Sequence, residues 1–126
     1  MLLPSRFPRR VRLALYALAV AILLVLCVLP NKDLPDPGTG DRFEHAAAWF
    51  VLTMTGYVLA PNRRLAMPAF AIAYGVFIEV LQGLAPTGRH SDPLDFVADL
   101  QGVALAVALM MAFRWVAARS VRIDGA

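Results

Sequence analysis

The most regular feature of the chain is an uninterrupted run of apolar residues at positions 13–29, LALYALAVAILLVLCVL. A helix needs about 20 mostly apolar residues to cross the hydrocarbon core of a bilayer. Arg9, Arg10 and Arg12 precede the run, and the residues after it contain no small-residue signal-peptide cleavage site. The pattern therefore predicts a retained transmembrane helix over residues 11–29.

Three further apolar segments follow, and each is bounded by turn-forming residues. Pro, Gly and Asp are frequent in residues 30–43, and the shorter breaks are PNRR at residues 61–64 and APTGRHSD at residues 85–92. Between these breaks we predict helices over residues 44–60, 65–84 and 93–117. The sequence thus predicts an all-α integral membrane bundle of four transmembrane helices, forming a single domain over residues 1–126.

Composition supports the bilayer as the surrounding solvent. Of the 126 residues, 60% are hydrophobic and 17% charged, and a chain this short cannot bury that much apolar surface in its own core. The arginines flank apolar runs and form no continuous basic face, which argues against a nucleic-acid partner. With its single cysteine, Cys27, the chain cannot form an internal disulfide.

The basic residues predict the orientation of the helices. One set of helix ends carries nine Lys and Arg residues, whereas the other carries three: Lys32, Arg42 and Arg89. Because loops on the cytoplasmic side are enriched in Lys and Arg, we expect the side with nine to be cytoplasmic. Four spans then place both termini in the cytoplasm.

The acidic residues follow the opposite distribution, since eight of the nine Asp and Glu residues lie at or near the expected outer side. Glu79 and Asp99 are each about 9 Å inside a predicted helix end, at about 1.5 Å per residue. A charge at membrane depth costs about 2.5–3.5 kcal/mol on insertion scales and marks a functional site by default. Two carboxylates at one depth cannot both be ionised cheaply, so we expect Glu79 and Asp99 to share a proton.

Helical spacing gathers further polar residues at the same level. Glu79 and Gln82 share one face, and steps of four back from Glu79 reach Gly75 and Ala71, small residues typical of helix contacts in membranes. Equivalent stripes occur in the helices on either side. We therefore expect one outer-face binding cavity that is lined by Asp41, His45, Glu79, Gln82, Arg89, Asp92, Asp95 and Asp99.

Several of these residues have simpler interpretations. Asp92 before Pro93 is typical of a helix N-cap, with Asp95 as an acid in the first turn. His45 could be an interfacial histidine, and Arg89 either a solvated loop charge or the counter-ion of Asp95 or Glu79. The buried acids could serve only for hydrogen bonding between helices.

The ordered set of motifs resembles the VanZ-like membrane proteins. The motifs are Asp41-Arg42-x-x-His45, Glu79-x-x-Gln82, Arg89-x-x-Asp92-x-x-Asp95 and Asp99-x-x-Gly102, spread over roughly residues 40–105. The family usually has Asn at the position of Asp99. The resemblance implies a multi-pass protein of the bacterial cytoplasmic membrane with a role in the cell envelope, in a family associated with resistance to the glycopeptide teicoplanin.

Three functions remain open from the sequence. The first is binding of an envelope lipid or glycan headgroup in the outer cavity. The second is an enzyme acting on such a headgroup, with Glu79, Asp95 and His45 as candidate acids and bases. The third is a structural membrane partner. The sequence contains no nucleophile motif, phosphate-binding loop or complete metal-ligand signature, so we expect neither a metal ion nor a cofactor, and we expect membrane lipids as partners.

Overall fold

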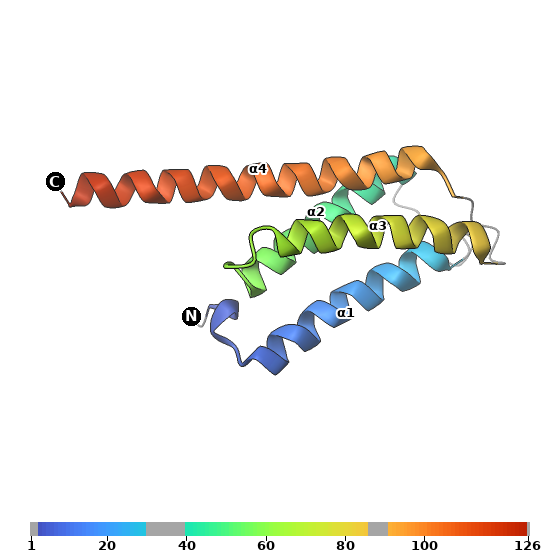
Figure 1. The fold of residues 1–126 in the computed structure, drawn as a ribbon, viewed down its shortest axis with the longest axis horizontal. Coiled ribbons are helices and arrows are strands. Elements are labelled where there is room, and N and C mark those ends of the chain that lie inside the picture. The colour runs from blue at the N-terminus through green and yellow to red at the C-terminus, as the bar shows by residue number, and fades with distance from the viewer. Residues whose placement is uncertain (1–2, 30–39, 86–90, 126) are drawn as a thin grey trace.

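The computed structural model of the chain describes residues 3–29, 40–85 and 91–125. These residues form a short 3-10 helix, η1 (Pro4–Arg6), and four α-helices: α1 (Arg9–Val28), α2 (Asp41–Leu59), α3 (Ala66–Leu84) and α4 (Pro93–Asp124). Successive α-helices run in opposite directions (Figure 1), and the described ranges contain no strand. The predicted all-α fold with four helices is confirmed.

Two helix boundaries differ from the prediction by more than two residues. α2 begins at Asp41 rather than near residue 44, directly after Gly40, whose φ of 86° suits glycine. α4 continues to Asp124 rather than ending near residue 117, because nothing in residues 118–124 breaks a helix before Gly125. Its 32 residues span about 48 Å, more than the hydrocarbon core of a bilayer. Its C-terminal part therefore extends past the other helices (Figure 1).

Three helices, α1, α3 and α4, are long and apolar enough to cross a membrane. Large apolar side chains on their outward faces are exposed, including Leu18, Val80 and Leu105. Such a surface is consistent with a multi-pass membrane protein, since lipid would cover it. α2 is less apolar because charged residues occupy its first turn, so its membrane crossing stays a prediction.

Helix α2 is packed against the other three α-helices, most extensively against α4. The α2–α4 crossing is close because Gly102 lacks a side chain: a Cβ there would collide with the carbonyl oxygen of Ala46. On the α3 side, the fully buried Trp49 donates its indole N–H to the carbonyl oxygen of Ala71 at 2.8 Å. Tyr74 in turn donates to the carbonyl oxygen of Val20 in α1, also at 2.8 Å.

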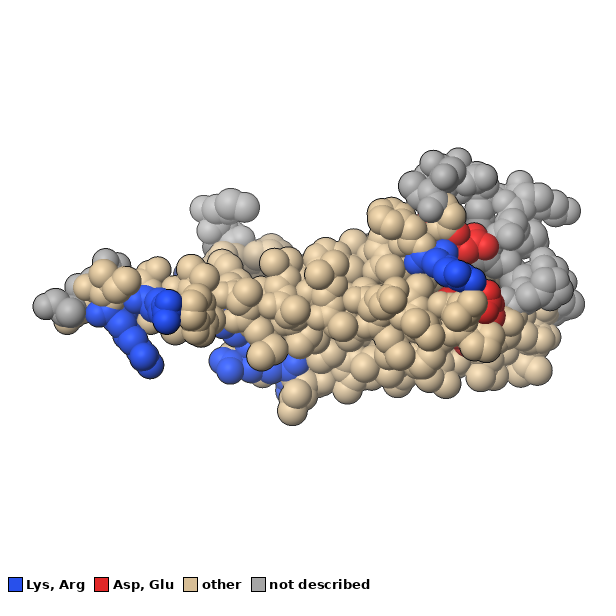
Figure 2. Space-filling model, turned by 90° about the horizontal axis from the view of Figure 1, so that it is seen from above, with Lys and Arg blue, Asp and Glu red and all other residues tan. Residues whose placement is uncertain are grey.

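The charges separate along the bundle. We call the region where α2 begins, α3 ends and α4 begins the polar end (residues 41–45, 79–84 and 91–99), and the region where α1 begins, α2 ends and α3 begins the basic end (residues 9–12 and 59–67). On the face in Figure 2, acidic side chains lie only at the polar end, and a broad uncharged belt separates them from basic side chains further along the molecule.

Candidate functional site

Four ionisable side chains from three helices meet at the polar end. His45 comes from the second turn of α2, Glu79 from the last turns of α3, and Asp95 and Asp99 from the first turns of α4. His45 (6% exposed), Glu79 (8%) and Asp99 (1%) are buried. Asp95 is partly buried. Charged groups placed this deep need specific partners, because desolvation is costly.

The shortest contact in this cluster joins α2 to α4. His45 Nδ1 and Asp99 Oδ1 lie 2.8 Å apart, within hydrogen-bonding distance. The other ring nitrogen, Nε2, faces Asp95 Oδ2 at 3.8 Å. The ring also stacks on Trp49, with centroids 5.7 Å apart and an interplanar angle of 14°. The imidazole is thus fixed in orientation, with Nε2 directed toward the carboxylates. The expectation that Asp99 shares a proton with Glu79 stays a prediction.

Glu79 is held by the segment that leads into α4. Its Oε2 accepts hydrogen bonds from the Asp92 backbone N–H at 3.0 Å and from the Ser91 hydroxyl at 3.3 Å. Its Oε1 is buried and has no hydrogen-bond partner in the described part of the chain. The segment before α4 therefore fixes one carboxylate oxygen and leaves the second available within the cluster.

Asp92 acts as the N-cap of α4, as the Asp-Pro motif predicts. Its Oδ1 accepts from the backbone N–H of Leu94 at 2.9 Å. Gln82 is fully buried but faces α1: its Nε2 donates to the carbonyl oxygen of Cys27 at 2.8 Å. Gln82 and Asp92 thus connect structural elements around the cluster, whereas His45, Glu79 and Asp95 face one another.

Two of the expected cavity residues are not among the four side chains of the cluster. Asp41 is exposed in the first turn of α2, near enough to Asp95 to influence it electrostatically. Arg89, expected as a counter-ion, lies outside the described residues. The proposed pairing of Arg89 with Asp95 or Glu79 therefore stays a prediction.

The small residues predicted on α3 make room for the cluster. A Cβ on Gly75 would come within 3.0 Å of Asp99 Oδ2 and 3.3 Å of Trp49 Nε1. Asp99 Oδ2 is buried and, among the described residues, without a hydrogen-bond partner. Chemically, the cluster offers unpaired carboxylate oxygens and one oriented imidazole, which suits a ligand that brings hydrogen-bond donors or positive charge.

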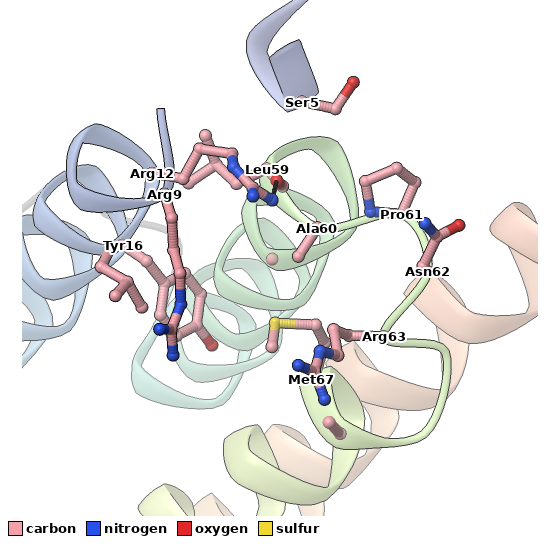
Figure 3. A pocket seen from close by; sticks show the side chains of 13 residues that line it. Ser5, Arg9, Arg12, Tyr16, Leu59, Ala60, Pro61, Asn62, Arg63 and Met67 are labelled. Carbon is pink, nitrogen blue, oxygen red and sulfur yellow. Dashed lines mark hydrogen bonds between the residues drawn. The ribbon is translucent and has the colours of Figure 1, made fainter. Parts of the chain in front are cut away.

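A second feature, at the basic end, was not anticipated from the sequence. A cavity of about 880 Å³ is lined by residues of η1, α1, α2, the turn after α2 and the start of α3, including Arg9, Arg12, Tyr16 and Arg63 (Figure 3). Arg12 donates to the carbonyl oxygens of Phe7 at 3.1 Å and of Leu59 at 3.0 Å.

The buried Tyr16 hydroxyl in this cavity lacks a hydrogen-bond partner in the described structure. In the sequence, the arginines of this cavity (Arg9, Arg12 and Arg63) indicate only the orientation of the helices in the membrane. The spacing of Arg9 and Arg12, three residues apart on one helical face, is the signal that could have indicated a shared site. The cavity is separate from the polar cluster and offers donors suited to an anion.

No protein-family model matches the chain, and neither the curated proteins nor the solved structures searched contain a match.

Proposed function

We propose that the chain is a VanZ-like multi-pass protein of the bacterial cytoplasmic membrane that binds the headgroup of an envelope lipid or glycan at the polar end. In this proposal all four α-helices cross the membrane, both termini are cytoplasmic, and the polar end faces outward. The Lys and Arg distribution supports the orientation. The resemblance in the His45, Glu79 and Asp95 motifs supports the envelope role.

The observation that carries the binding proposal is the set of buried acceptor atoms without donors. Glu79 Oε1 and Asp99 Oδ2 are both inaccessible and unpaired in the described structure. An unsatisfied buried polar group costs about 1–3 kcal/mol. The hydroxyl and amide groups of a glycan headgroup carry the missing donors, and a headgroup at the membrane surface is close to this level of the bundle.

Charge favours the sugar portion of a headgroup over a bare phosphate. Three further acidic residues lie at the helix starts around the cluster: Asp41 and Glu44 in α2, and Asp92 directly before α4. The basic residue in the described polar end is Arg42. An acidic surrounding repels a phosphate but accepts hydrogen bonds from sugar hydroxyls. We therefore expect discrimination between saccharide-bearing and saccharide-free lipids.

Binding to the purified chain in detergent tests this function. The probes are a polyprenyl-linked disaccharide, the same polyprenyl phosphate without sugar, and phosphatidylglycerol, each measured by native mass spectrometry. We expect the disaccharide lipid to bind best and Glu79→Gln to weaken its binding by about tenfold, as for loss of one charge-assisted hydrogen bond. Asp124→Asn, which removes a carboxylate at the far end of α4, is the control.

The outcomes separate binding from a purely structural role. If Glu79→Gln leaves both stability and binding unchanged, or if all three lipids bind equally, the headgroup proposal is wrong. If the wild type binds none of the probes while remaining folded, the cluster serves helix packing. In either case the membrane topology can be tested independently.

The His45–Asp99 pair favours one second candidate, an enzyme acting on the same headgroup. A histidine whose Nδ1 is held by a carboxylate presents Nε2 as a general base, and Asp95 is 3.8 Å from that nitrogen. Incubating the disaccharide lipid with the chain and analysing the products by mass spectrometry tests this candidate. Turnover that His45→Gln abolishes would support it, and an unchanged probe would exclude it for that substrate.

A further inference from the structure

The polar end brings together three side chains of the kinds that bind metal ions. A ring nitrogen of His45 and carboxylate oxygens of Glu79 and Asp95 all lie within 4.8 Å of one another. The three residues belong to α2, α3 and α4, so this arrangement exists only when the bundle is folded. The sequence contains no compact ligand motif, because the residues are far apart along the chain.

Asp99 gives the histidine the orientation that a metal ligand needs. Asp99 Oδ1 lies 2.8 Å from His45 Nδ1, and the other ring nitrogen, Nε2, is directed at Asp95. Metal-binding histidines commonly donate their second ring N–H to a carboxylate, which fixes the tautomer and makes the coordinating nitrogen more basic. In such a site Asp99 is a positioning residue and does not itself contact the ion.

Glu79 supplies the observation that points to a cation. The side chain is only 8% exposed, yet Oε1 has no hydrogen-bond partner among the described residues, while Oε2 is already held by Asp92 and Ser91. Buried carboxylates are normally paired with a cation or coordinate a metal. A cation between His45, Glu79 and Asp95 would satisfy this oxygen.

We infer that His45 Nε2, Glu79 and Asp95 bind one divalent first-row transition-metal ion, of the class of Zn²⁺ or Mn²⁺. Imidazole together with carboxylates suits these ions, whereas Ca²⁺ requires six to eight oxygen ligands. Three protein ligands leave at least one coordination position open to water or to an oxygen of a bound molecule.

The ligand atoms are near, but slightly wider than, the spacing of a loaded site. In a tetrahedral site, bonds of about 2.0–2.2 Å place neighbouring ligands roughly 3.3–3.6 Å apart. The His45 Nε2 to Asp95 Oδ2 distance is 3.8 Å. The widest separation in the cluster, 4.8 Å or less, requires the side chains to close by up to roughly 1.5 Å on binding the ion.

The inference goes beyond the proposed headgroup function, because the ion needs no lipid in order to bind. The chain is purified in detergent with a tag that contains no histidine, stripped with a chelator and dialysed. Zn²⁺ and Mn²⁺ are then added, first separately and then together, and bound metal is measured by elemental mass spectrometry. We expect one Zn²⁺ per chain and competition by Mn²⁺.

X-ray absorption of the Zn²⁺-loaded chain identifies the ligand. The chain has two histidines, His45 and His90. We expect a Zn–N shell at about 2.0–2.1 Å from one imidazole, with oxygen ligands completing the site. His90→Gln leaves His45 as the sole histidine, so an imidazole signal in this variant comes from His45 even if His45→Gln fails to fold.

Matched variants complete the test. His45→Gln, Glu79→Gln and Asp95→Asn should each weaken Zn²⁺ binding by at least tenfold, and Asp99→Leu by about 10–100-fold through loss of the positioning bond. His90→Gln and Asp124→Asn should bind as the wild type does. The inference is overturned if the folded wild type, checked by circular dichroism, binds no Zn²⁺, or if the His90→Gln spectrum lacks imidazole. Unchanged binding in folded His45→Gln would overturn it equally.

Discussion

His45 Nδ1 and Asp99 Oδ1, 54 positions apart in the sequence, lie 2.8 Å apart in the buried contact between α2 and α4. This pair connects the fold to the chemistry of the polar end. The hydrogen bond holds two helices together, and it also determines which ring nitrogen faces Asp95. A substitution at Asp99 therefore separates the effect of charge from the effect of the hydrogen bond.

Asp99→Asn keeps an oxygen that accepts from His45 Nδ1–H but removes the charge. We expect it to be tolerated or stabilising in a thermal melt of the chain in detergent. Asp99→Leu leaves the His45 N–H buried without an acceptor and should lower the free energy of unfolding by about 1–3 kcal/mol. Equal destabilisation by both variants would mean that the charge of Asp99, rather than its hydrogen bond, stabilises the contact.

Gly102 should be intolerant of any side chain, because its Cβ would collide with the backbone of Ala46. We expect Gly102→Ala to destabilise the chain by about 1–3 kcal/mol through overpacking, measured by unfolding in detergent. Gly83→Ala is the control: among the described residues its Cβ would meet the Ser91 Cβ, at an ordinary 3.4 Å. It should be neutral or stabilising by about 0.5–1 kcal/mol, since alanine favours a helix more than glycine. Similar effects of the two substitutions would contradict the close α2–α4 crossing.

Much of the fold could be predicted from the sequence, because long apolar runs and turn residues specify helices locally. The N-cap role of Asp92 follows from a local motif and is confirmed. The end of α4 was predicted too early, because apolarity declines before helix propensity does. A helix that leaves the apolar belt has no local signal to stop until Gly125.

The contacts of the candidate site were harder to predict. The sequence places His45, Glu79 and Asp99 at one level, but partner choice depends on how α2 and α4 cross, which is set by the packing of Gly102 against Ala46. The amide of Gln82 likewise contacts the carbonyl oxygen of Cys27 in α1. Spacing within one helix carries no information about such contacts between helices.

Arg12 should stabilise the basic end more than its neighbour Arg10. Arg12 donates to the carbonyl oxygens of Phe7 and Leu59, and so ties the segment after η1 to the end of α2, whereas Arg10 is exposed. Hydrogen bonds from a charged group contribute about 1.5–3 kcal/mol, so Arg12→Ala should lower the free energy of unfolding by an amount in this range. Arg10→Ala should change it by less than about 0.5 kcal/mol, as for most surface substitutions. Equal effects in a detergent melt would show that Arg12 acts only as a surface charge.

The proposed four-span topology can be tested in intact cells. We expect reporters fused after Arg122 or inserted after Asn62 to be cytoplasmic, and a reporter inserted at Thr87 to be external. The physical reason is the nine-to-three asymmetry of Lys and Arg, because positive charges beside a span are retained in the cytoplasm.

The critical helix is α2, whose first-turn charges lower its apolarity. If α2 did not cross, α1 and α3 would be consecutive spans. The Asn62 reporter would then be external and the Thr87 reporter cytoplasmic. Val51→Asp places a charge on the exposed face of α2 and so shortens its apolar part. This substitution should disturb the topology only if α2 spans the membrane. An external Asn62 reporter or a cytoplasmic Thr87 reporter in the wild type would refute the four-span arrangement and, with it, the outward-facing placement of the polar end.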